Sequence, residues 1–430
     1  MLFGQNNIME YIEEMDVKFV RLAFCDIFGQ MKNISVMASE LPRVLREGVP
    51  FDASQIAGFM AVEESDLILM PNVSTGEILP WRPQEGRVLR LFCDIRYPDG
   101  RPFEGDGRYL LKQAVEKLRE LGFECEIGVE CEFYLFEMDD DGRRPVRVPH
   151  DEGGYLDVTP LDRGENIRRE ICLMLEEMGM LPQSSHHEKG PGQHEIIFKH
   201  SRAASAADHF ISFKNMIKTV ANINGLHASF MPKPIAKKSG SGLHINFSLC
   251  GTDEKPAEEE VCQQFMAGIM GHIKEMTAFL NPTTNSYARF GEFEAPSFIT
   301  WSRQNRAQLL RMVKDAEGRG RIELRSPDSA CNPYFAYALL LWAGMEGIEK
   351  KMTLEPAVDI TDKTDIQGIE ALPVSLEEAV AEAEKSSFLK KVLPAPILAA
   401  YFAEKMRECV SYAAAEDKAA YDYRQYFEAL

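Results

Sequence analysis

The sequence predicts an α+β protein with more than one domain, and three observations support this. Its 430 residues exceed what one ordinary hydrophobic core organises. Up to about Gly105, short apolar runs such as residues 17–22 and 87–92 are joined by Pro- and Gly-rich connections, which is typical of short β-strands. Beyond that point, helical and strand-like patterns alternate. We therefore expect a small β-rich domain at residues 1–104 and a larger domain at residues 105–430.

The larger domain is expected to begin with a helix. Asp106 is a suitable N-cap, apolar residues from Leu110 to Leu121 follow at helical spacing, and Gly122 provides a stop. Further helical patterns occupy residues 165–177, 207–222, 258–280, 335–350 and 376–384. The charged motifs between these helices are strand-like, so the sequence indicates a large sheet that carries the functional side chains.

Composition and charge exclude several classes of protein. A formal net charge of -19 argues against a nucleic-acid partner, because phosphate backbones require a basic surface. The nine cysteines include no C-x-x-C pair, which favours reduced core residues over a zinc site or disulfides. Residues 1–8 lack the features of a secretory signal, and no stretch approaches the ~20 apolar residues that a membrane span needs. We expect a cytoplasmic protein.

An acidic strand at residues 123–133 is the most informative local feature. Apolar side chains alternate there with Glu124, Glu126, Glu130 and Glu132, so the four carboxylates share one strand face. Like charges on one face repel each other unless water screens them or cations neutralise them. For such a strand taken alone, a solvated face is the more common explanation.

Three further segments supply partners for these acids. Residues 187–198 have the pattern of a hairpin that brings two more carboxylates together. Residues 239–246 form a glycine-rich approach to a strand that carries His244, and residues 321–325 place Arg, Glu and Arg on one strand face. Each motif alone is weak, because structural histidines and salt-bridged strands are common.

Together the motifs predict a site for phosphoryl transfer. Carboxylate oxygens with one imidazole suit Mg²⁺ or Mn²⁺ better than zinc, and Mg²⁺ typically bridges substrate phosphates. Arginines are concentrated between residues 289 and 325 of this acidic chain, and guanidinium groups match the geometry of phosphates and carboxylates. Metals, arginines and acids in one site indicate phosphoryl transfer onto an anionic substrate.

These motifs occur in the same order as the motifs of a known protein family. Matching segments lie at residues 51–59, 128–133, 186–188, 192–195, 230–234, 240–244, 281–287, 294–296 and 321–328. In this respect the chain resembles a type I glutamine synthetase over nearly its whole length. The resemblance implies a small N-terminal β-grasp domain followed by a large catalytic domain, in which helices flank a curved antiparallel sheet. It also implies that ATP drives the joining of glutamate and ammonium into glutamine through a γ-glutamyl phosphate.

The resemblance assigns two or more Mg²⁺ or Mn²⁺ ions to the site and gives each motif residue a role. One metal would be held by Glu132, Glu188 and Glu195, and the other by Glu130, His244 and Glu323. Gly240, Arg289 and Arg325 would bind glutamate, while Ser248, Arg306, Arg311 and Arg321 would bind ATP, with Arg306 also acting in catalysis. Glu294 matches a flap acid that shields the intermediate from water, and Asp52 matches an aspartate that a neighbouring subunit contributes to the ammonium site.

The resemblance also implies a homo-oligomer. The expected assembly is a dodecamer of two stacked hexamers, with each active site at a boundary between subunits. Asp52 lies far from the other site residues in sequence, which is compatible with a contribution from another chain.

Some positions near the substrates depart from the family pattern, and they leave two alternatives open. Ser239, Gln55 and a flap at residues 288–294 that is one residue shorter than usual change the surroundings of the amine. A related γ-glutamyl ligase that uses a different amine is therefore the first alternative. A non-catalytic family member is the second, and it ranks last because all six metal positions hold competent side chains.

Overall fold

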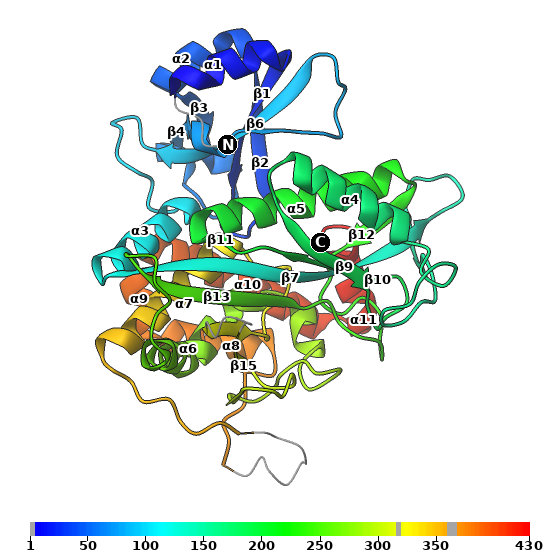
Figure 1. Ribbon diagram of the computed structural model, residues 1–430, viewed down its shortest axis with the longest axis vertical. Helices are drawn as coiled ribbons and strands as arrows, with labels where there is room; N and C mark the ends of the chain where they lie inside the picture. The colour runs from blue at the N-terminus through cyan, green and yellow to red at the C-terminus, as the bar shows by residue number, and fades with distance from the viewer. Residues whose placement is uncertain (1–4, 315–319, 359–367) are drawn as a thin grey trace.

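The computed structural model describes residues 5–314, 320–358 and 368–430, and its strands form two sheets (Figure 1). The first sheet has the strand order β2-β1-β6-β4-β3, with β5 beside β6. Its strands are β1 (Val17–Cys25), β2 (Met31–Met37), β3 (Val49–Asp52), β4 (Asp66–Pro71), β5 (Glu77–Ile78) and β6 (Arg87–Arg96). β1 and β6 are parallel neighbours, and they confirm both strands predicted in this part of the sequence. Helices α1 (Gln5–Glu14) and α2 (Leu41–Glu47) accompany this sheet at one end of the molecule.

The second sheet is larger and is organised around one long strand, β7 (Phe123–Met138). The strand order is β14-β15-β16-β13-β7-β10-β9, and β8, β11 and β12 also pair with β7. The other strands are β8 (Pro145–Pro149), β9 (Pro182–His187), β10 (Gln193–Phe198), β11 (Ser201–Arg202), β12 (Leu226–Ser229), β13 (Leu243–Gly251), β14 (Trp301–Ser302), β15 (Leu310–Lys314) and β16 (Gly320–Leu324). All pairings of β7 are antiparallel, and β7 and β13 run side by side across the sheet (Figure 1).

Helices flank the curled second sheet, as expected for an α+β fold. They are α3 (Gly107–Glu120), α4 (Glu165–Glu177), α5 (Ala203–Ile223), α6 (Glu259–Leu280), α7 (Pro333–Glu349), α8 (Leu376–Lys385), α9 (Ser387–Val392), α10 (Ala395–Ala414) and α11 (Lys418–Asp422). All six helices predicted beyond residue 105 are present. The Asp106 side chain accepts a hydrogen bond from the Arg108 backbone N–H at 3.0 Å, which confirms the expected N-cap.

The core beneath the sheet depends on a close helix pair. α7 is apolar and buried along almost its whole length, and it packs against α6. A Cβ atom at Gly268 would lie 2.0 Å from the Ala343 carbonyl oxygen, and one at Gly347 would lie 2.0 Å from the Gln264 carbonyl oxygen. The two helix backbones therefore touch where glycine replaces larger side chains.

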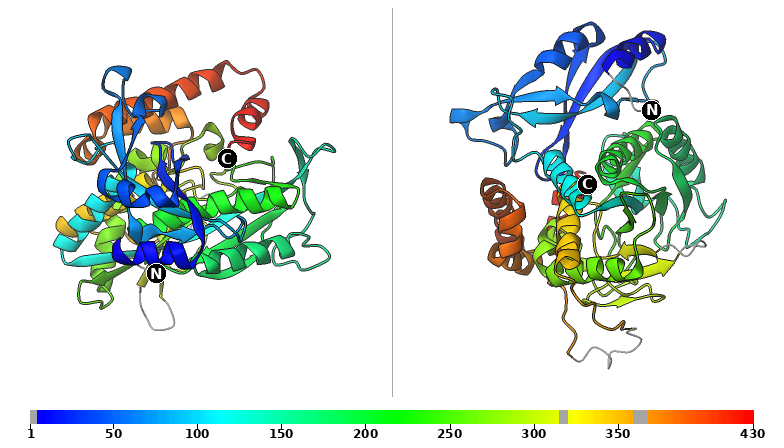
Figure 2. Two further views of the ribbon diagram at one scale, coloured as in Figure 1. Left: turned by 90° about the horizontal axis from the view of Figure 1, so that it is seen from above. Right: turned by 60° about the vertical axis from the view of Figure 1, so that its left-hand side comes forward.

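Buried polar contacts fix the first sheet to the larger part of the molecule. Arg108 of α3 lies 2.6 Å from Asp94 of β6 and 3.0 Å from Asp208 of α5. Arg90 of β6 donates to the Ser212 hydroxyl of α5 at 2.5 Å. Figure 2 shows the first sheet and its helices as a lobe beside the larger sheet. Among the described residues, no helix has both the length and the apolar character that crossing a membrane requires.

Candidate active site

The acidic face of β7 is present as predicted. Cys131 and Phe133 are fully buried on the core side of the strand, whereas Glu130 and Glu132 lie on the opposite side and are only partly buried. Strand alternation alone explains this division, because successive side chains point to opposite faces. The acids therefore border an open space rather than the hydrophobic core.

Strand register brings distant residues to this face. Glu195 of β10 lies opposite Glu132, and His244 of β13 lies opposite Glu130. On the far side of β13, Glu323 of β16 lies opposite Asn246. Glu188 follows directly after β9, which pairs with β10 as the predicted hairpin.

The six predicted metal ligands converge on one cavity of about 580 Å³. Five of them line it: Glu130, Glu132, Glu188, Glu195 and His244. Glu323 is 1% exposed and lies behind the wall, with its carboxylate 3.9 Å from His244 Nδ1. The geometry therefore places all six side chains around a single site.

Negative charge at the centre of this site lacks compensation from the protein. Burial, together with the charges of Glu132, Glu130 and Glu188, raises the pKa of Glu195 to about 10. Burial also raises the pKa of Glu132. Carboxylates with these properties suit a divalent cation, because the cation supplies the charge that the surrounding side chains do not.

The opposite end of the acidic cluster is better compensated. Burial alone would raise the pKa of Glu130, but the hydrogen bond and charge of His244 lower it to about 2. His244 Nδ1 lies 3.2 Å from Glu130, and Asn246 donates a hydrogen bond to the same carboxylate at 3.2 Å. Glu130 is therefore held ionised, as a metal ligand must be.

The donor atoms form two overlapping groups. The ligand atoms of Glu130, Glu195 and His244 lie within 4.8 Å of one another, and so do those of His186, Glu188 and Glu195. His186 was not among the predicted site residues, although it lies two positions before Glu188. Its Nε2 lies 3.0 Å from Glu188 and 3.3 Å from Glu195. Strand alternation between His186 and Glu188 could have revealed it.

A third cluster of potential ligands lies behind the β9–β10 hairpin. His187 Nδ1 donates to the Glu188 carbonyl oxygen at 2.7 Å, and His187 Nε2 donates to Asp151 at 2.8 Å. The neighbouring His194 accepts a hydrogen bond at Nδ1 from the Arg168 guanidinium at 2.8 Å, which places the proton on Nε2. A protonated Nε2 beside a guanidinium cannot bind a cation, so this cluster supports the hairpin rather than a metal.

The predicted glutamate-binding residues lie at the same cavity. Gly240, Arg289 and Arg325 line it. The Arg289 guanidinium donates to the Ser326 carbonyl oxygen at 3.0 Å, which fixes the direction of its side chain. A Cβ atom at Gly240 would lie 2.5 Å from Arg289 Cγ, so only glycine allows this close approach.

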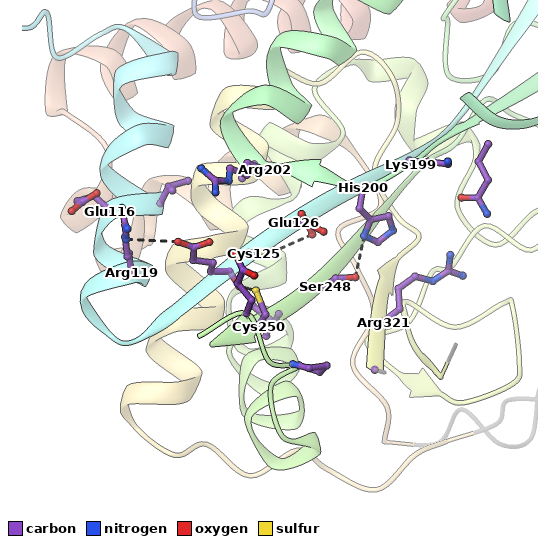
Figure 3. A pocket seen from close by; sticks show the side chains of 18 residues that line it. Glu116, Arg119, Cys125, Glu126, Lys199, His200, Arg202, Ser248, Cys250 and Arg321 are labelled. Carbon is purple, nitrogen blue, oxygen red and sulfur yellow. Dashed lines mark hydrogen bonds and ion pairs between the residues drawn. The ribbon is translucent and has the colours of Figure 1, made fainter. Parts of the chain in front are cut away.

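The predicted ATP-binding residues extend from this cavity into a second one. Arg306, Arg311 and Arg321 line the first cavity, and Arg321 and Gln183 also line an adjacent cavity of about 880 Å³. Ser248 lies only in the adjacent cavity, where its hydroxyl is 3.0 Å from His200 Nδ1 (Figure 3). Arg321 thus lies where the two cavities meet.

Glu294 and Asp52 occupy different places. Glu294 lies at the rim of the first cavity, on the segment that follows η5 (Thr284–Ala288). Asp52 ends β3 in the first lobe and does not line the cavity of its own chain. Its exposed carboxylate accepts hydrogen bonds from the Ser54 hydroxyl and backbone N–H, which lower the pKa of Asp52.

Comparisons with known proteins agree with this geometry. The glutamine synthetase catalytic domain matches residues 104–426, and the glutamine synthetase beta-Grasp domain matches residues 16–98. The chain belongs to the glutamine synthetase family. The glutamine synthetase of Clostridium saccharobutylicum is 43% identical over 428 residues, covering 95% of this chain and 96% of the relative. That of Methanosarcina mazei is 41% identical over 425 residues, covering 95% of each chain.

A solved structure resembles the whole chain. The structure titled "GmaS/ADP complex-Conformation 1" has a TM-score of 0.85 and 29% sequence identity, and the match covers 97% of this chain and 98% of that chain. Together with the two family matches, this similarity shows that the β-grasp lobe and the sheet with flanking helices have the glutamine synthetase fold.

Membership of this family establishes the overall reaction. As a glutamine synthetase, the chain forms glutamine from glutamate and ammonium with ATP and divalent metal. The curated relatives, near 42% identity over most of the chain, do not favour the alternative of a different amine or of a non-catalytic protein.

Proposed function

We propose that the six converging side chains hold two divalent metal ions during glutamine synthesis. Glu132, Glu188 and Glu195 would hold one ion, and Glu130, His244 and Glu323 would hold the other. The ions, Mg²⁺ or Mn²⁺, would supply positive charge to the transferring phosphoryl group. The convergence of all six residues on one cavity is the observation that carries this proposal.

We propose that the arginines around the cavity divide between the two anionic substrates. Arg289, Arg325 and the backbone at Gly240 would orient glutamate. Arg306, Arg311 and Arg321 would bind ATP phosphates, with Ser248 further along the adjacent cavity. Attack of the glutamate γ-carboxylate on the terminal phosphoryl group brings two anions together, so guanidinium groups lower its barrier by opposing their repulsion.

We propose that Glu294 and Asp52 act in amide formation, the step that follows phosphoryl transfer to glutamate. The acyl phosphate formed by that transfer is readily hydrolysed, so the segment carrying Glu294 would exclude water. Its carboxylate, with Asp52 of a neighbouring subunit, would bind ammonium and accept a proton as the amine attacks. The phosphate then leaves as the amide forms.

We also propose a domain boundary and an assembly that fit this function. The domain boundary would lie between residues 104 and 105, and the chain would assemble as a dodecamer of two stacked hexamers in the cytoplasm. The exposed position of Asp52, outside the cavity of its own chain, supports a site completed by a second subunit.

The reaction is tested by measuring glutamine and phosphate with glutamate, ATP and ammonium in the presence of Mg²⁺ or Mn²⁺. We expect one phosphate for each glutamine and little turnover with larger amines in place of ammonium. Turnover only with a larger amine would contradict the proposal, as would metal-independent activity.

A further inference from the structure

A lysine bridges the two sides of the cavity mouth. Lys189 lies in the turn between β9 and β10, and Glu294 lies across the cavity on the flap. The Lys189 Nζ atom is 2.9 Å from Glu294 Oε2. This ion pair connects the hairpin that carries Glu188 and Glu195 to the flap.

The same lysine also contacts a proposed metal ligand. Its backbone N–H donates a hydrogen bond to Glu188 Oε2 at 2.9 Å. The side chain of Lys189 therefore binds the flap, while its backbone orients a carboxylate inside the site. Any movement of the turn affects both contacts.

The flap needs external contacts to keep its shape. Phe293 and Glu294 have φ angles of +47° and +69°, in the left-handed region that non-glycine residues disfavour. Backbone turns within the flap, such as that from Ala295 N–H to Glu292 O, are short-range contacts that support this conformation. Two lysines add contacts from outside: Lys233 binds Glu292 at 2.6 Å, and Lys189 binds Glu294.

We propose that Lys189 is a positioning residue that holds Glu294 over the cavity while the acyl phosphate is present. This inference rests on the proposed role of Glu294. The 2.9 Å contact of the lysine is with Oε2 of Glu294, and the other carboxylate oxygen would bind the substrate ammonium. The pair is partly exposed, at 39% for Lys189 and 48% for Glu294, so it is weak enough to open for substrate entry and product release.

Loss of this contact has a distinct chemical consequence. A flap that is not held closed admits water, and water competes with ammonium for the acyl phosphate. Hydrolysis regenerates glutamate and releases phosphate, so ATP is consumed without glutamine. The ratio of phosphate to glutamine therefore reports on Lys189 in a way that general loss of stability does not.

The experiment compares Lys189→Met with Lys189→Arg, which keeps the positive charge, and with the control Lys238→Met. Lys238 is exposed on the loop before Gly240, and its side chain makes no ion pair within the described residues. With saturating glutamate and ATP, phosphate and glutamine are measured across a range of ammonium concentrations. We expect Lys189→Met to release several-fold more phosphate than glutamine and to show a raised KM for ammonium. Lys189→Arg and Lys238→Met should stay close to one phosphate per glutamine.

A one-to-one ratio and an unchanged KM in Lys189→Met would overturn the inference and leave Lys189 as a surface ion pair. A raised ratio that arginine does not restore would also overturn it. Failure of the unmodified enzyme to form glutamine would instead reject the proposed function, so the two failures are distinguishable.

Discussion

Individual acids of this site differ sharply in how the protein compensates their charge. The Glu323 carboxylate binds Arg311 and Arg325 at 2.5 Å each and lies near His244, so it is surrounded by cationic groups. Burial alone would raise the pKa of Glu323, but His244 and Arg325 lower it. Glu195 has mainly acids around it. The site therefore combines one acid held between cationic side chains with another whose charged neighbours are mostly acids.

Replacing Glu323 by Gln tests the first of these environments. The amide keeps the volume, but it no longer supplies a charged ligand. Its single oxygen can accept a hydrogen bond from only one of the two arginines, which bind different oxygens of Glu323. We expect activity to fall by about 10²-fold or more while the fold and assembly persist. Glutamine formation and size-exclusion chromatography measure the two effects, with Glu346→Gln of α7, outside the cavity, as the control. Full activity in Glu323→Gln would contradict the metal assignment.

The raised pKa of Glu195 predicts how stability changes with pH. A carboxyl whose pKa is raised by folding contributes stability below its unfolded value, near 4.5, and this contribution is lost as pH rises toward its folded value of about 10. Protein stripped of divalent ions should therefore become less stable between about pH 5 and pH 9. Thermal denaturation measures this slope, and added Mg²⁺ or Mn²⁺ should reduce it. An equally steep slope in Glu195→Gln would show that another group is responsible.

At the scale of elements, the helix and strand patterns predicted most of what positions the site. The predicted helix at residues 165–177 matches α4. The predicted hairpin at residues 187–198 includes all of β10 but only the last residue of β9, which begins at Pro182. α10 was not predicted, because it begins among prolines and its many alanines weaken the apolar pattern. The acidic face of β7 was visible in the sequence, and strand alternation from Glu188 could also have indicated His186. The position of Lys189 was not visible, because it depends on how the hairpin folds over the cavity.

Stability measurements can test how much the close contact between helices α6 and α7 contributes to folding. Gly268→Ala places a methyl group against the α7 backbone, and we expect a loss of about 1–3 kcal/mol or more in the free energy of unfolding. Gly271→Ala on the same helix is the control, because its Cβ atom would meet only the flexible end of Met352, at 3.3 Å. Chemical denaturation measures both variants. Equal stability of the two would mean that the helices can separate without cost.

At the scale of the whole molecule, the position of Asp52 bears on the proposed sharing of active sites between subunits. The residue lies on the first lobe, outside the cavity of its own chain. A sequence pattern could associate Asp52 with the site only through family resemblance, because no local spacing connects residue 52 to residues 130–325. No periodic pattern in the sequence indicates how subunits would contact one another either.

Mixing two inactive variants tests this sharing. Asp52→Asn and Glu323→Gln disable different halves of the proposed site. If each site combines Asp52 of one subunit with Glu323 of its neighbour, random co-assembly in equal amounts should restore about a quarter of the native activity. Co-expression with two affinity tags and measurement of glutamine formation provide the test. No recovery in verified mixed assemblies would mean that both residues act from the same chain.

Because β7 pairs with many other strands, it affects how the chain folds while it is being synthesised. β7 is synthesised early, yet its pairing with β13 and the addition of β16 must wait until later segments leave the ribosome. During that interval the strand has open edges, which can pair with other nascent chains unless chaperones cover them. The proposed metal site is therefore complete only after β16 brings Glu323 to a sheet that begins at residue 123.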